Sequence, residues 1–227
     1  MMSVTRIAQG VQARIHRHLL DPWQDRRLGI EAAGLHWPNE LSLGGSNAQY
    51  SNEYFGTPSW VLDRALDALN IDPSRFVFVD FGCGKGRVLF RAAMRPFRRV
   101  EGIELSATMH SIALKNISLA EAAGLVRSPV VSHCMDVTEY DLPRDPLVLY
   151  LFNSFGEAVI KQVLERLETS LREHPRECYF IYLNPVHQDC IARCSFLQEM
   201  LRPAWTKVLD RLISPWPLIT YHTLPQK

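Results

Sequence analysis

The feature that most constrains the fold is a run of apolar residues followed at once by three glycines at alternate positions. Phe76 to Val79 are four consecutive apolar residues, and Gly82, Gly84 and Gly86 follow them. An apolar run without alternation is typical of a parallel strand covered on both faces. Glycine lets the backbone turn sharply and approach a ligand, because no Cβ is in the way. The residues after Gly86 are compatible with a helix, so the sequence predicts a strand, a ligand-binding turn and a helix.

The spacing of these glycines differs from the dinucleotide-binding pattern. It is Gly-x-Gly-x-Gly, whereas the fingerprint Gly-x-Gly-x-x-Gly would place its third glycine at Arg87. The stretch Val79 to Gly86 instead resembles motif I of the class I, seven-strand S-adenosylmethionine-dependent methyltransferases. The resemblance implies S-adenosylmethionine as cofactor and S-adenosylhomocysteine as product. The cofactor contacts that it implies in this stretch are Asp80, Gly82, Cys83, Gly84 and Gly86.

Acidic residues end the next two predicted strands. Glu104 closes a strand predicted over 99–104 and lies 18 residues beyond Gly86. In a nucleotide-binding βαβ unit, an acid at this position accepts hydrogen bonds from ribose hydroxyls. The alternative for Glu104 is an ordinary surface carboxylate. Asp136 ends a strand predicted over 128–136, and the resemblance implies that it contacts the adenine amino group, with Asp141 and Asp145 as competitors.

A second segment of interest precedes the glycine turn. Thr57 and Pro58 lead into a helix predicted over 59–70, and threonine at the N-cap followed by proline is a common helix start. The same segment resembles the non-SET lysine methyltransferases, in which a Tyr…Gly…Thr segment folds over the methionine end of the cofactor. The resemblance makes Tyr54 and Thr57 candidate cofactor contacts, with helix capping and core packing as the alternative.

The corner Asn153-Ser154-Phe155-Gly156 follows a strand predicted over 146–152. Open α/β sheets bind ligands in the crevice at the carboxyl ends of their strands. The corner resembles motif IV of the non-SET lysine methyltransferases, but it lacks both prolines of the Asn-Pro-Pro-aromatic signature of methylases acting on amide or base nitrogens. The resemblance implies that Asn153 contacts the cofactor and, together with Tyr54, positions the methyl acceptor. Asparagine is also a common turn former.

Together these elements predict an α/β fold. A strand over 177–184, a helix over 190–201 and a hairpin of strands 207–213 and 218–224 complete the series. The expected architecture is a three-layer α/β/α sandwich around a mostly parallel seven-stranded sheet, of order 3-2-1-4-5-7-6, with an antiparallel C-terminal strand. We expect residues 1–52 to form an N-terminal helix and an extended arm or lid, and residues 53–227 to form the methyltransferase domain.

The composition limits the classes of partner that we expect the chain to bind. A formal net charge of +1 gives no overall attraction to nucleic acid or to anionic membranes, and no apolar run approaches the ~20 residues of a membrane span. We therefore expect neither as a partner. The five cysteines are an odd number without a secretory signal, which favours reduced thiols and a cytoplasmic location. His187, Cys190 and Cys194 share helical spacing but lack a fourth ligand, so no metal is expected.

The sequence leaves the methyl acceptor open. The first hypothesis is methyl transfer to a small metabolite or to a protein lysine or similar amine. Aromatic residues in the predicted arm favour a lid over a small acceptor; they are Trp23, His36, Trp37 and Tyr50. One alternative is an RNA-directed methyltransferase or RNA-binding protein that uses the basic stretch 85–99. Another is a non-catalytic cofactor-binding partner protein on the same fold.

Overall fold

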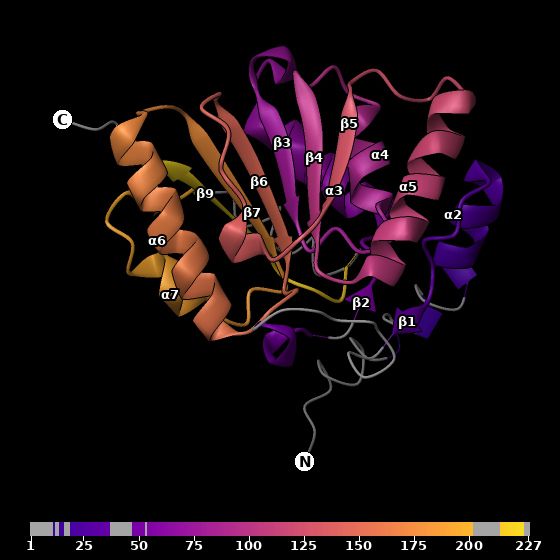
Figure 1. The fold of residues 1–227 in the computed structure, drawn as a ribbon, viewed down its shortest axis with the longest axis horizontal. Coiled ribbons are helices and arrows are strands. Elements are labelled where there is room, and N and C mark those ends of the chain that lie inside the picture. The colour runs from indigo at the N-terminus through magenta and orange to yellow at the C-terminus, as the bar shows by residue number, and fades with distance from the viewer. Residues whose placement is uncertain are drawn as a thin grey trace.

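A seven-stranded sheet forms the centre of the molecule (Figure 1). The computed structural model describes residues 11, 14–15, 19–36, 47–52, 54–201 and 214–224. The strands are β3 (Val77–Phe81), β4 (Arg99–Glu104), β5 (Val130–Cys134), β6 (Leu147–Phe152), β7 (Cys178–Leu183), β8 (Leu197–Glu199) and β9 (Leu218–Thr223). Their order is β5-β4-β3-β6-β7-β9-β8. Counted along the chain, this is the order 3-2-1-4-5-7-6, as predicted, except that the sixth strand is β8 and not the strand predicted over 207–213.

The strand directions also agree with the prediction. Strands β3 to β7 pair in parallel, whereas β9 is antiparallel to both β7 and β8. All five residues of β3 are buried, as are the first five of β6. These two central strands therefore bury both faces, which explains why their sequences are apolar runs without alternation.

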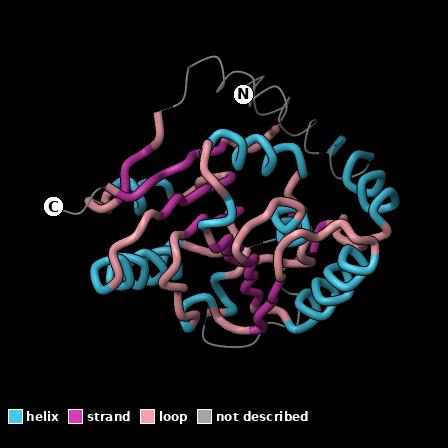
Figure 2. Tube along the Cα trace, turned by 90° about the horizontal axis from the view of Figure 1, so that it is seen from above, coloured by secondary structure: helices cyan, strands magenta, loops and turns pink. Residues whose placement is uncertain are grey.

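Helices cover both faces of the sheet, as Figure 2 shows from above. On one face lie α3 (Ser59–Leu69), α4 (Arg87–Ala93) and α5 (Ala107–Ala122), whose apolar residues join a core with Phe76 and Phe78. On the other face lie α6 (Glu157–Glu173) and α7 (Gln188–Ala192), which share a second core with Val77 and Val79. The alternation of Phe and Val along β3 thus serves the two cores, and the three-layer prediction is confirmed.

The predicted extended arm contains a helix. Residues 21–28 form α2 (Asp21–Leu28), with a proline at the start of its first turn and Gly29 as C-cap at a φ of +69°. An extended arm or loop was expected here because of the two prolines, the Gly44-Gly45 pair and the turn formers between residues 21 and 51. Proline is favoured in the first turn of a helix, and glycine is favoured just after its end. The arm continues into β1 (Leu35–His36), which pairs with β2 (Tyr54–Phe55).

The C-terminal part also departs from the expectation. The helix predicted over 190–201 is shorter, because α7 ends at Ala192 and the residues after it form the edge strand β8. The strand predicted over 207–213 lies outside the described residues, as does most of the N-terminal helix predicted over 1–20. Within the part of the chain that the structure describes, no helix has the length and apolarity of a membrane span.

Candidate functional site

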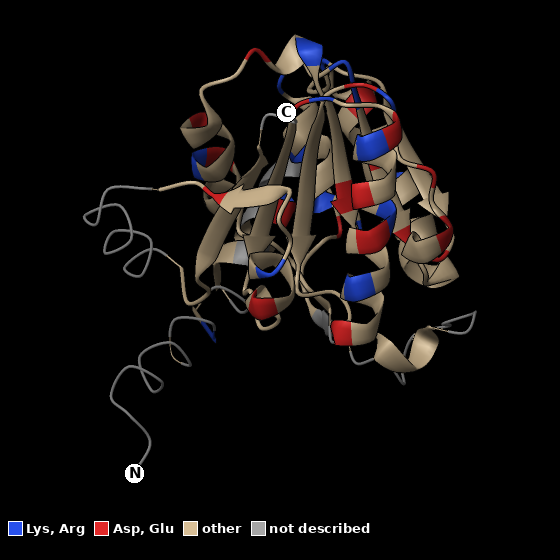
Figure 3. Ribbon diagram, turned by 90° about the vertical axis from the view of Figure 1, so that its left-hand side faces the viewer, with Lys and Arg blue, Asp and Glu red and all other residues tan. Residues whose placement is uncertain are grey.

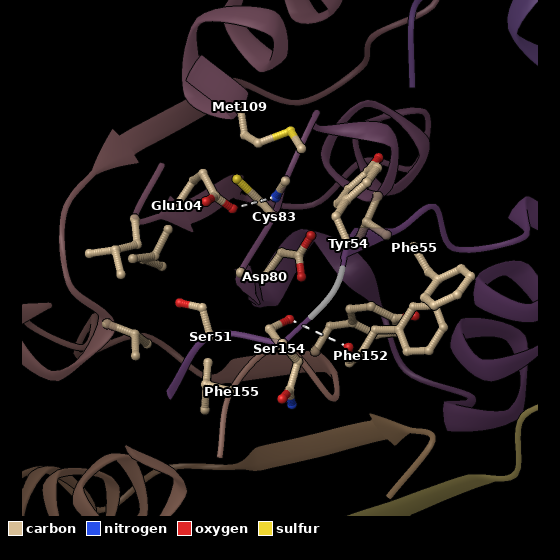
Figure 4. Close-up of a pocket in the computed structure, with 18 of the residues that line it drawn as sticks. Ser51, Tyr54, Phe55, Asp80, Cys83, Glu104, Met109, Phe152, Ser154 and Phe155 are labelled. Carbon is tan, nitrogen blue, oxygen red and sulfur yellow. Dashed lines mark hydrogen bonds between the residues drawn. The ribbon is translucent and has the colours of Figure 1, made fainter. Parts of the chain in front are cut away.

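A pocket lies at the carboxyl ends of β3, β4 and β6, where the predicted site residues converge (Figure 4). Its lining includes these predicted residues: Tyr54, Thr57, Asp80, Gly82, Cys83, Gly84, Glu104 and Asp136. The other two predicted cofactor contacts, Gly86 and Asn153, are not among its lining residues. Because parallel strands present their carboxyl ends at one edge, the sheet brings together side chains that are far apart in the sequence.

The glycine turn follows β3 and depends on close contacts that only glycine allows. Gly82, Gly84 and Gly86 have φ values of +80°, +53° and +79°. A Cβ added at Gly82 would lie 2.4 Å from Cβ of Ser154, and one at Gly84 would lie 2.2 Å from the Tyr54 ring. Tyr54 and Ser154 therefore pack directly on the backbone of the turn. Neither contact is visible as a local sequence pattern.

The amide groups of the turn are bound within the protein. The N–H groups of Gly82 and Cys83 both donate to the carbonyl of Ile103, at 2.9 and 3.0 Å. The Gly86 N–H donates to the Cys83 carbonyl at 2.9 Å, and the Gly84 N–H donates to Glu104 Oε2 at 2.8 Å. These bonds give the turn its shape. They differ from the expectation that the amides themselves approach a ligand, so the turn contributes close backbone surface and a framework for Glu104.

Glu104, at the end of β4, is a buried carboxylate on the pocket wall. Its second oxygen, Oε1, accepts a hydrogen bond of 2.8 Å from the Ser106 N–H, while Oε2 binds the Gly84 amide. Burial raises the pKa of Glu104, and the backbone hydrogen bonds oppose that rise. A carboxylate has about four lone-pair sites, so two bound amides leave acceptor capacity for a ligand.

Asp80 has a different environment from Glu104. It is 2% exposed, lies in β3, and its carboxyl group sits between Glu104, Tyr54 and Ser154 in the view of Figure 4. Among the described residues, none forms a hydrogen bond or ion pair with this carboxyl group. Burial raises the pKa of Asp80 well above its usual range, and the negative charge of Glu104 adds to that rise. A buried acid without a protein partner is typical of a group that meets a ligand.

Asp136 lies just after β5 and is also buried at the pocket. Its Oδ1 accepts from the backbone N–H of Thr138 at 2.9 Å and from the Thr138 hydroxyl at 2.7 Å, which caps a short 3-10 turn. Its Oδ2 accepts from the side-chain amide of Asn47 at 2.9 Å. The competitors proposed from the sequence lie elsewhere: Asp141 pairs with Arg166, and Asp145 pairs with Arg98 and Arg99.

Thr57 is not a helix cap. The N-cap of α3 is Pro58, and the Thr57 hydroxyl instead lies 2.9 Å from the hydroxyl of Tyr150 in β6. Thr57 is 4% exposed and Tyr150 is fully buried, so the pair joins the segment before α3 to the central sheet. The capping interpretation failed because the hydroxyl finds a partner across the fold.

A strand-like segment closes one side of the pocket. Ser51 forms an isolated antiparallel bridge with Phe155, the Asn52 N–H donates to the Ser154 carbonyl at 3.0 Å, and the Gly156 N–H donates to the Tyr50 carbonyl at 2.8 Å. Ser51 and Asn52 line the pocket with Asn47, whereas Trp23, His36 and Tyr50, three of the aromatic residues expected to form a lid, are not among its lining residues. Trp23 is 53% exposed, and the fourth, Trp37, lies outside the described residues.

Asn153 occupies the corner after β6 in a left-handed conformation, with a φ of +42°. Its carbonyl accepts a 2.8 Å hydrogen bond from the Asn52 side chain, and its own side-chain oxygen lies 3.5 Å from the Tyr182 hydroxyl. The next residue, Ser154, lines the pocket instead. Asn153 itself is not among the residues that line the pocket, and its acceptor-positioning role stays a prediction.

A buried ion pair ties the N-terminal arm to the glycine turn. Arg87, the first residue of α4, lines the pocket and donates from Nη2 to Asp25 Oδ1 of α2 at 2.5 Å. Both side chains are buried, at 3% and 7% exposure. Asp25 Oδ2 also accepts from the N–H groups of Ala32 and Ala33. Neither Asp25 nor the pocket position of Arg87 was predicted from the sequence, because their pairing spans 62 residues.

Two further contacts hold the same arm. Lys85 is buried and donates from Nζ to the Ala33 carbonyl at 3.1 Å, and the Tyr54 hydroxyl donates to the Ala32 carbonyl at 2.8 Å. Burial lowers the pKa of Lys85. The side chain of Lys85 is therefore engaged with the arm, and Lys85 is not among the residues that line the pocket.

The basic stretch 85–99 is compensated by acids. Besides the Lys85 and Arg87 contacts, Arg91 pairs with Asp63, Arg95 with Asp63 and Asp67, and Arg98 and Arg99 pair with Asp145. Figure 3 shows positive and negative residues interspersed over the helices. The positive charges of this stretch are therefore interspersed with negative ones and do not form a continuous cationic surface.

Comparisons with known proteins bear on the fold. No protein-family model and no curated protein sequence matches this chain. A solved structure of a predicted N6-adenine-specific DNA methylase from Listeria monocytogenes has a TM-score of 0.51 at 13% identity, covering 75% of this chain and 52% of that one. The sheet order and this similarity agree. The chain has the seven-stranded, Rossmann-like methyltransferase fold.

Two other solved structures show weaker similarity. An RNA methyltransferase from Salinibacter ruber in complex with S-adenosyl-L-homocysteine is 22% identical, at a TM-score of 0.49, over 75% of this chain and 94% of that one. The ribosomal protein L11 methylase from Lactobacillus delbrueckii is 14% identical, also at 0.49, over 74% and 78%. The name of the Listeria structure mentions DNA, so the comparison gives no support to the expectation that nucleic acid is not a partner.

Proposed function

We propose that this protein is an S-adenosylmethionine-dependent methyltransferase with a small-molecule acceptor. The observation that supports it most is the combination of a glycine turn packed closely by Tyr54 and Ser154 with the buried acids Asp80 and Glu104 in one pocket. When bound, S-adenosylmethionine supplies an electrophilic sulfonium methyl group, so the protein has mainly to align the reactants and exclude water.

The acids of the pocket suit the polar groups of this cofactor. We assign Glu104 to the ribose hydroxyls, because its carboxylate keeps acceptor capacity beyond the two amides that it binds. Asp80 is assigned to the amino group of the methionine end, where a positive charge would stabilise its buried carboxylate. Asp136 is assigned to the adenine amino group, and Tyr54 and Thr57 to the wall beside the methionine end.

The wall formed by Asn47, Ser51 and Asn52 supports a small acceptor. Backbone hydrogen bonds join this wall to the corner after β6, so a segment of the chain covers one side of the pocket. A pocket that is covered on one side suits a small molecule better than a protein lysine, which needs an open channel. An amine acceptor would have to lose its proton before attack, and desolvation inside the pocket favours the neutral amine.

A nucleic-acid base as acceptor has less support from the corner after β6. Phe155 lines the pocket, but it is only 7% exposed and packs in the core beneath α6, so little of its ring is available as a stacking surface for a flipped base. The Asn153 side chain points to Tyr182, away from the residues that line the pocket. RNA therefore remains the alternative acceptor class to be tested.

Transfer of a labelled methyl group to a cell extract tests this proposal. The wild-type protein is incubated with S-adenosylmethionine labelled on its methyl group and with an extract, and the products are separated into metabolites, protein and RNA. We expect label in a small molecule, and none with the Glu104→Gln variant. Label in protein or RNA would contradict the acceptor class. Cofactor binding without any label would favour the non-catalytic alternative.

A further inference from the structure

Acidic side chains outnumber basic ones among the residues that line the pocket, and the two kinds lie at different positions. The lining residues include the acids Asp80, Glu104 and Asp136. Arg87 is the only lysine or arginine among the described residues that line the pocket. Asp80 lies in the strand before the glycine turn, and Arg87 is the first residue of the helix after it. One short turn thus carries a buried acid on one side and a buried base on the other.

The guanidinium group of Arg87 is held in place on two sides. Asp25 binds Nη2 from α2, and the backbone of Gly56 approaches so closely that a Cβ there would lie 3.0 Å from Nη1. Asp25 is in turn fixed by the N–H groups of Ala32 and Ala33. A charged side chain with 3% exposure needs such compensation, because removing it from water costs several kcal/mol. The arm therefore keeps Arg87 buried at the pocket.

We propose that Arg87 binds the carboxylate of the cofactor's methionine end and that Asp25 is a positioning residue that orients Arg87. This inference rests on the proposed function. An α-amino acid carries an ammonium and a carboxylate on the same carbon, so its recognition needs an acid and a base close together. Asp80 and Arg87 provide these two charges at the same turn. Arginine suits a carboxylate because its planar fork donates two parallel hydrogen bonds.

The proposal makes the N-terminal arm part of the cofactor site. Asp25 accepts from both the arm backbone and Arg87, so it connects residues 25–33 to the pocket. Loss of the Asp25 charge should alter the orientation of Arg87 and lower the affinity for the carboxylate, without changing the groups that meet the adenosine. This selective effect distinguishes a positioning role from a general loss of folding.

The test compares the affinities of S-adenosylmethionine and decarboxylated S-adenosylmethionine, which differ only in the carboxylate. Equilibrium binding is measured by calorimetry on the full chain. We expect the wild type to prefer the carboxylate-bearing compound by roughly 10- to 100-fold, as for hydrogen bonds between charged groups. Arg87→Gln should abolish this preference while keeping the affinity for the decarboxylated compound within about threefold. Asp25→Asn should reduce the preference in the same direction.

Two further variants control for folding and for charge. Asp25→Asn combined with Arg87→Gln leaves no unpaired buried charge, and it should lose the preference as Arg87→Gln does. Arg91→Gln removes an arginine of the same helix that pairs with Asp63 away from the pocket, and it should keep the wild-type preference. Binding of the decarboxylated compound reports that the pocket is intact in each variant.

The outcomes separate this inference from the proposed function. If the wild type binds both compounds equally, or if Arg87→Gln keeps the preference, the assignment of Arg87 is wrong while the cofactor proposal stands. If Arg87→Gln and the double variant weaken both compounds to the same degree, Arg87 is structural and the inference is again overturned. If the wild type binds neither compound, the proposed function fails and takes the inference with it.

Discussion

Asp80 combines an unfavourable contribution to stability with a position suited to binding. Because burial and Glu104 raise the pKa of Asp80, the folded protein holds this proton at a pH where the unfolded chain has released it. Below the pKa that this group has in the unfolded chain, Asp80 therefore does not reduce the free energy of unfolding. The free energy of unfolding falls as the pH rises from there towards the raised pKa of the folded state. A buried carboxylate kept at such a cost is expected to serve a ligand.

Asp80→Asn should therefore stabilise the cofactor-free protein at neutral pH. We expect a rise in Tm of roughly 2–4 °C, which corresponds to about 1 kcal/mol for a chain of this size, and a weaker affinity for S-adenosylmethionine. The gain should shrink as the pH is lowered towards and below 3.8, the ordinary pKa of aspartate, because the wild-type carboxyl group then becomes protonated in both states. Thermal unfolding followed across this pH range checks the prediction. A loss of stability that is equal at all pH values would contradict it.

Glu104→Gln should weaken cofactor binding by about 1–3 kcal/mol, the cost of losing hydrogen bonds to a charged group. Both oxygens of Glu104 accept from amides, at Gly84 and Ser106, and the glutamine NH₂ group cannot accept in place of one of them. Glu121→Gln on the exposed face of α5 is the matched control. Calorimetry with both variants measures the difference. An unchanged affinity in Glu104→Gln would remove this residue from the site.

At the scale of elements, one buried asparagine joins the arm to the rest of the fold. The Asn116 side chain of α5 is fully buried, accepts from the Glu31 N–H at 2.9 Å, and donates to the carbonyls of Glu31 and Lys85 at 3.1 and 2.9 Å. It therefore binds the arm and the glycine turn at once. The arm depends on such contacts because α2 has only eight residues, too few for an isolated helix.

Asn116→Ala should lower the free energy of unfolding by about 2–3 kcal/mol, because it leaves backbone groups of Glu31 and Lys85 without their partner. The neighbouring Lys115→Ala, which removes an exposed side chain, should change it by less than about 0.5 kcal/mol. Urea denaturation measures both values. Hydrogen exchange gives a second measurement, since the Glu31 amide should exchange faster in Asn116→Ala. Equal stabilities of the two variants would show that the arm is not anchored here.

The elements that were predicted well are those whose sequence pattern reflects burial. Strands β3 and β6 are mainly apolar runs because both of their faces are covered, and the structure places them where the sequence does. The elements that were missed are short or lie at an edge. Helix α2 contains a proline and is followed by a glycine, and β8 has three residues, of which two are exposed. Such segments are too short for a hydrophobic period to be recognised in their sequence.

The same distinction holds for the site. The residues at strand ends, such as Glu104 and Asp136, were found because their position follows from the strands. Asn47, Ser51 and Ser154 reach the pocket through long-range backbone and side-chain contacts that leave no local signature. Asn153 was chosen from motif similarity, which gives the position of a residue but not the contact of its side chain with Tyr182, and its role stays a prediction.

At the scale of the whole molecule, the charge balance bears on the choice of substrate. The cations of the stretch 85–99 are paired with acids, and the net charge of the chain is only +1. We expect Arg91→Gln combined with Arg95→Gln to change the affinity for a mixed single-stranded RNA by less than about twofold, and its salt dependence not at all. Fluorescence titrations between 50 and 200 mM salt check this. A large loss of salt-dependent affinity would restore the RNA hypothesis.

The central claim is that the pocket at the carboxyl edge of the sheet binds S-adenosylmethionine, and one measurement tests it directly. Calorimetric titration of the full chain with S-adenosylmethionine should show one site with a Kd at or below tens of micromolar, a weak to moderate affinity on the usual scale. S-adenosylhomocysteine should compete for this site, NAD should not, and Glu104→Gln should weaken the binding. Absence of binding by the wild type, or equal binding by the wild type and Glu104→Gln, would contradict the claim.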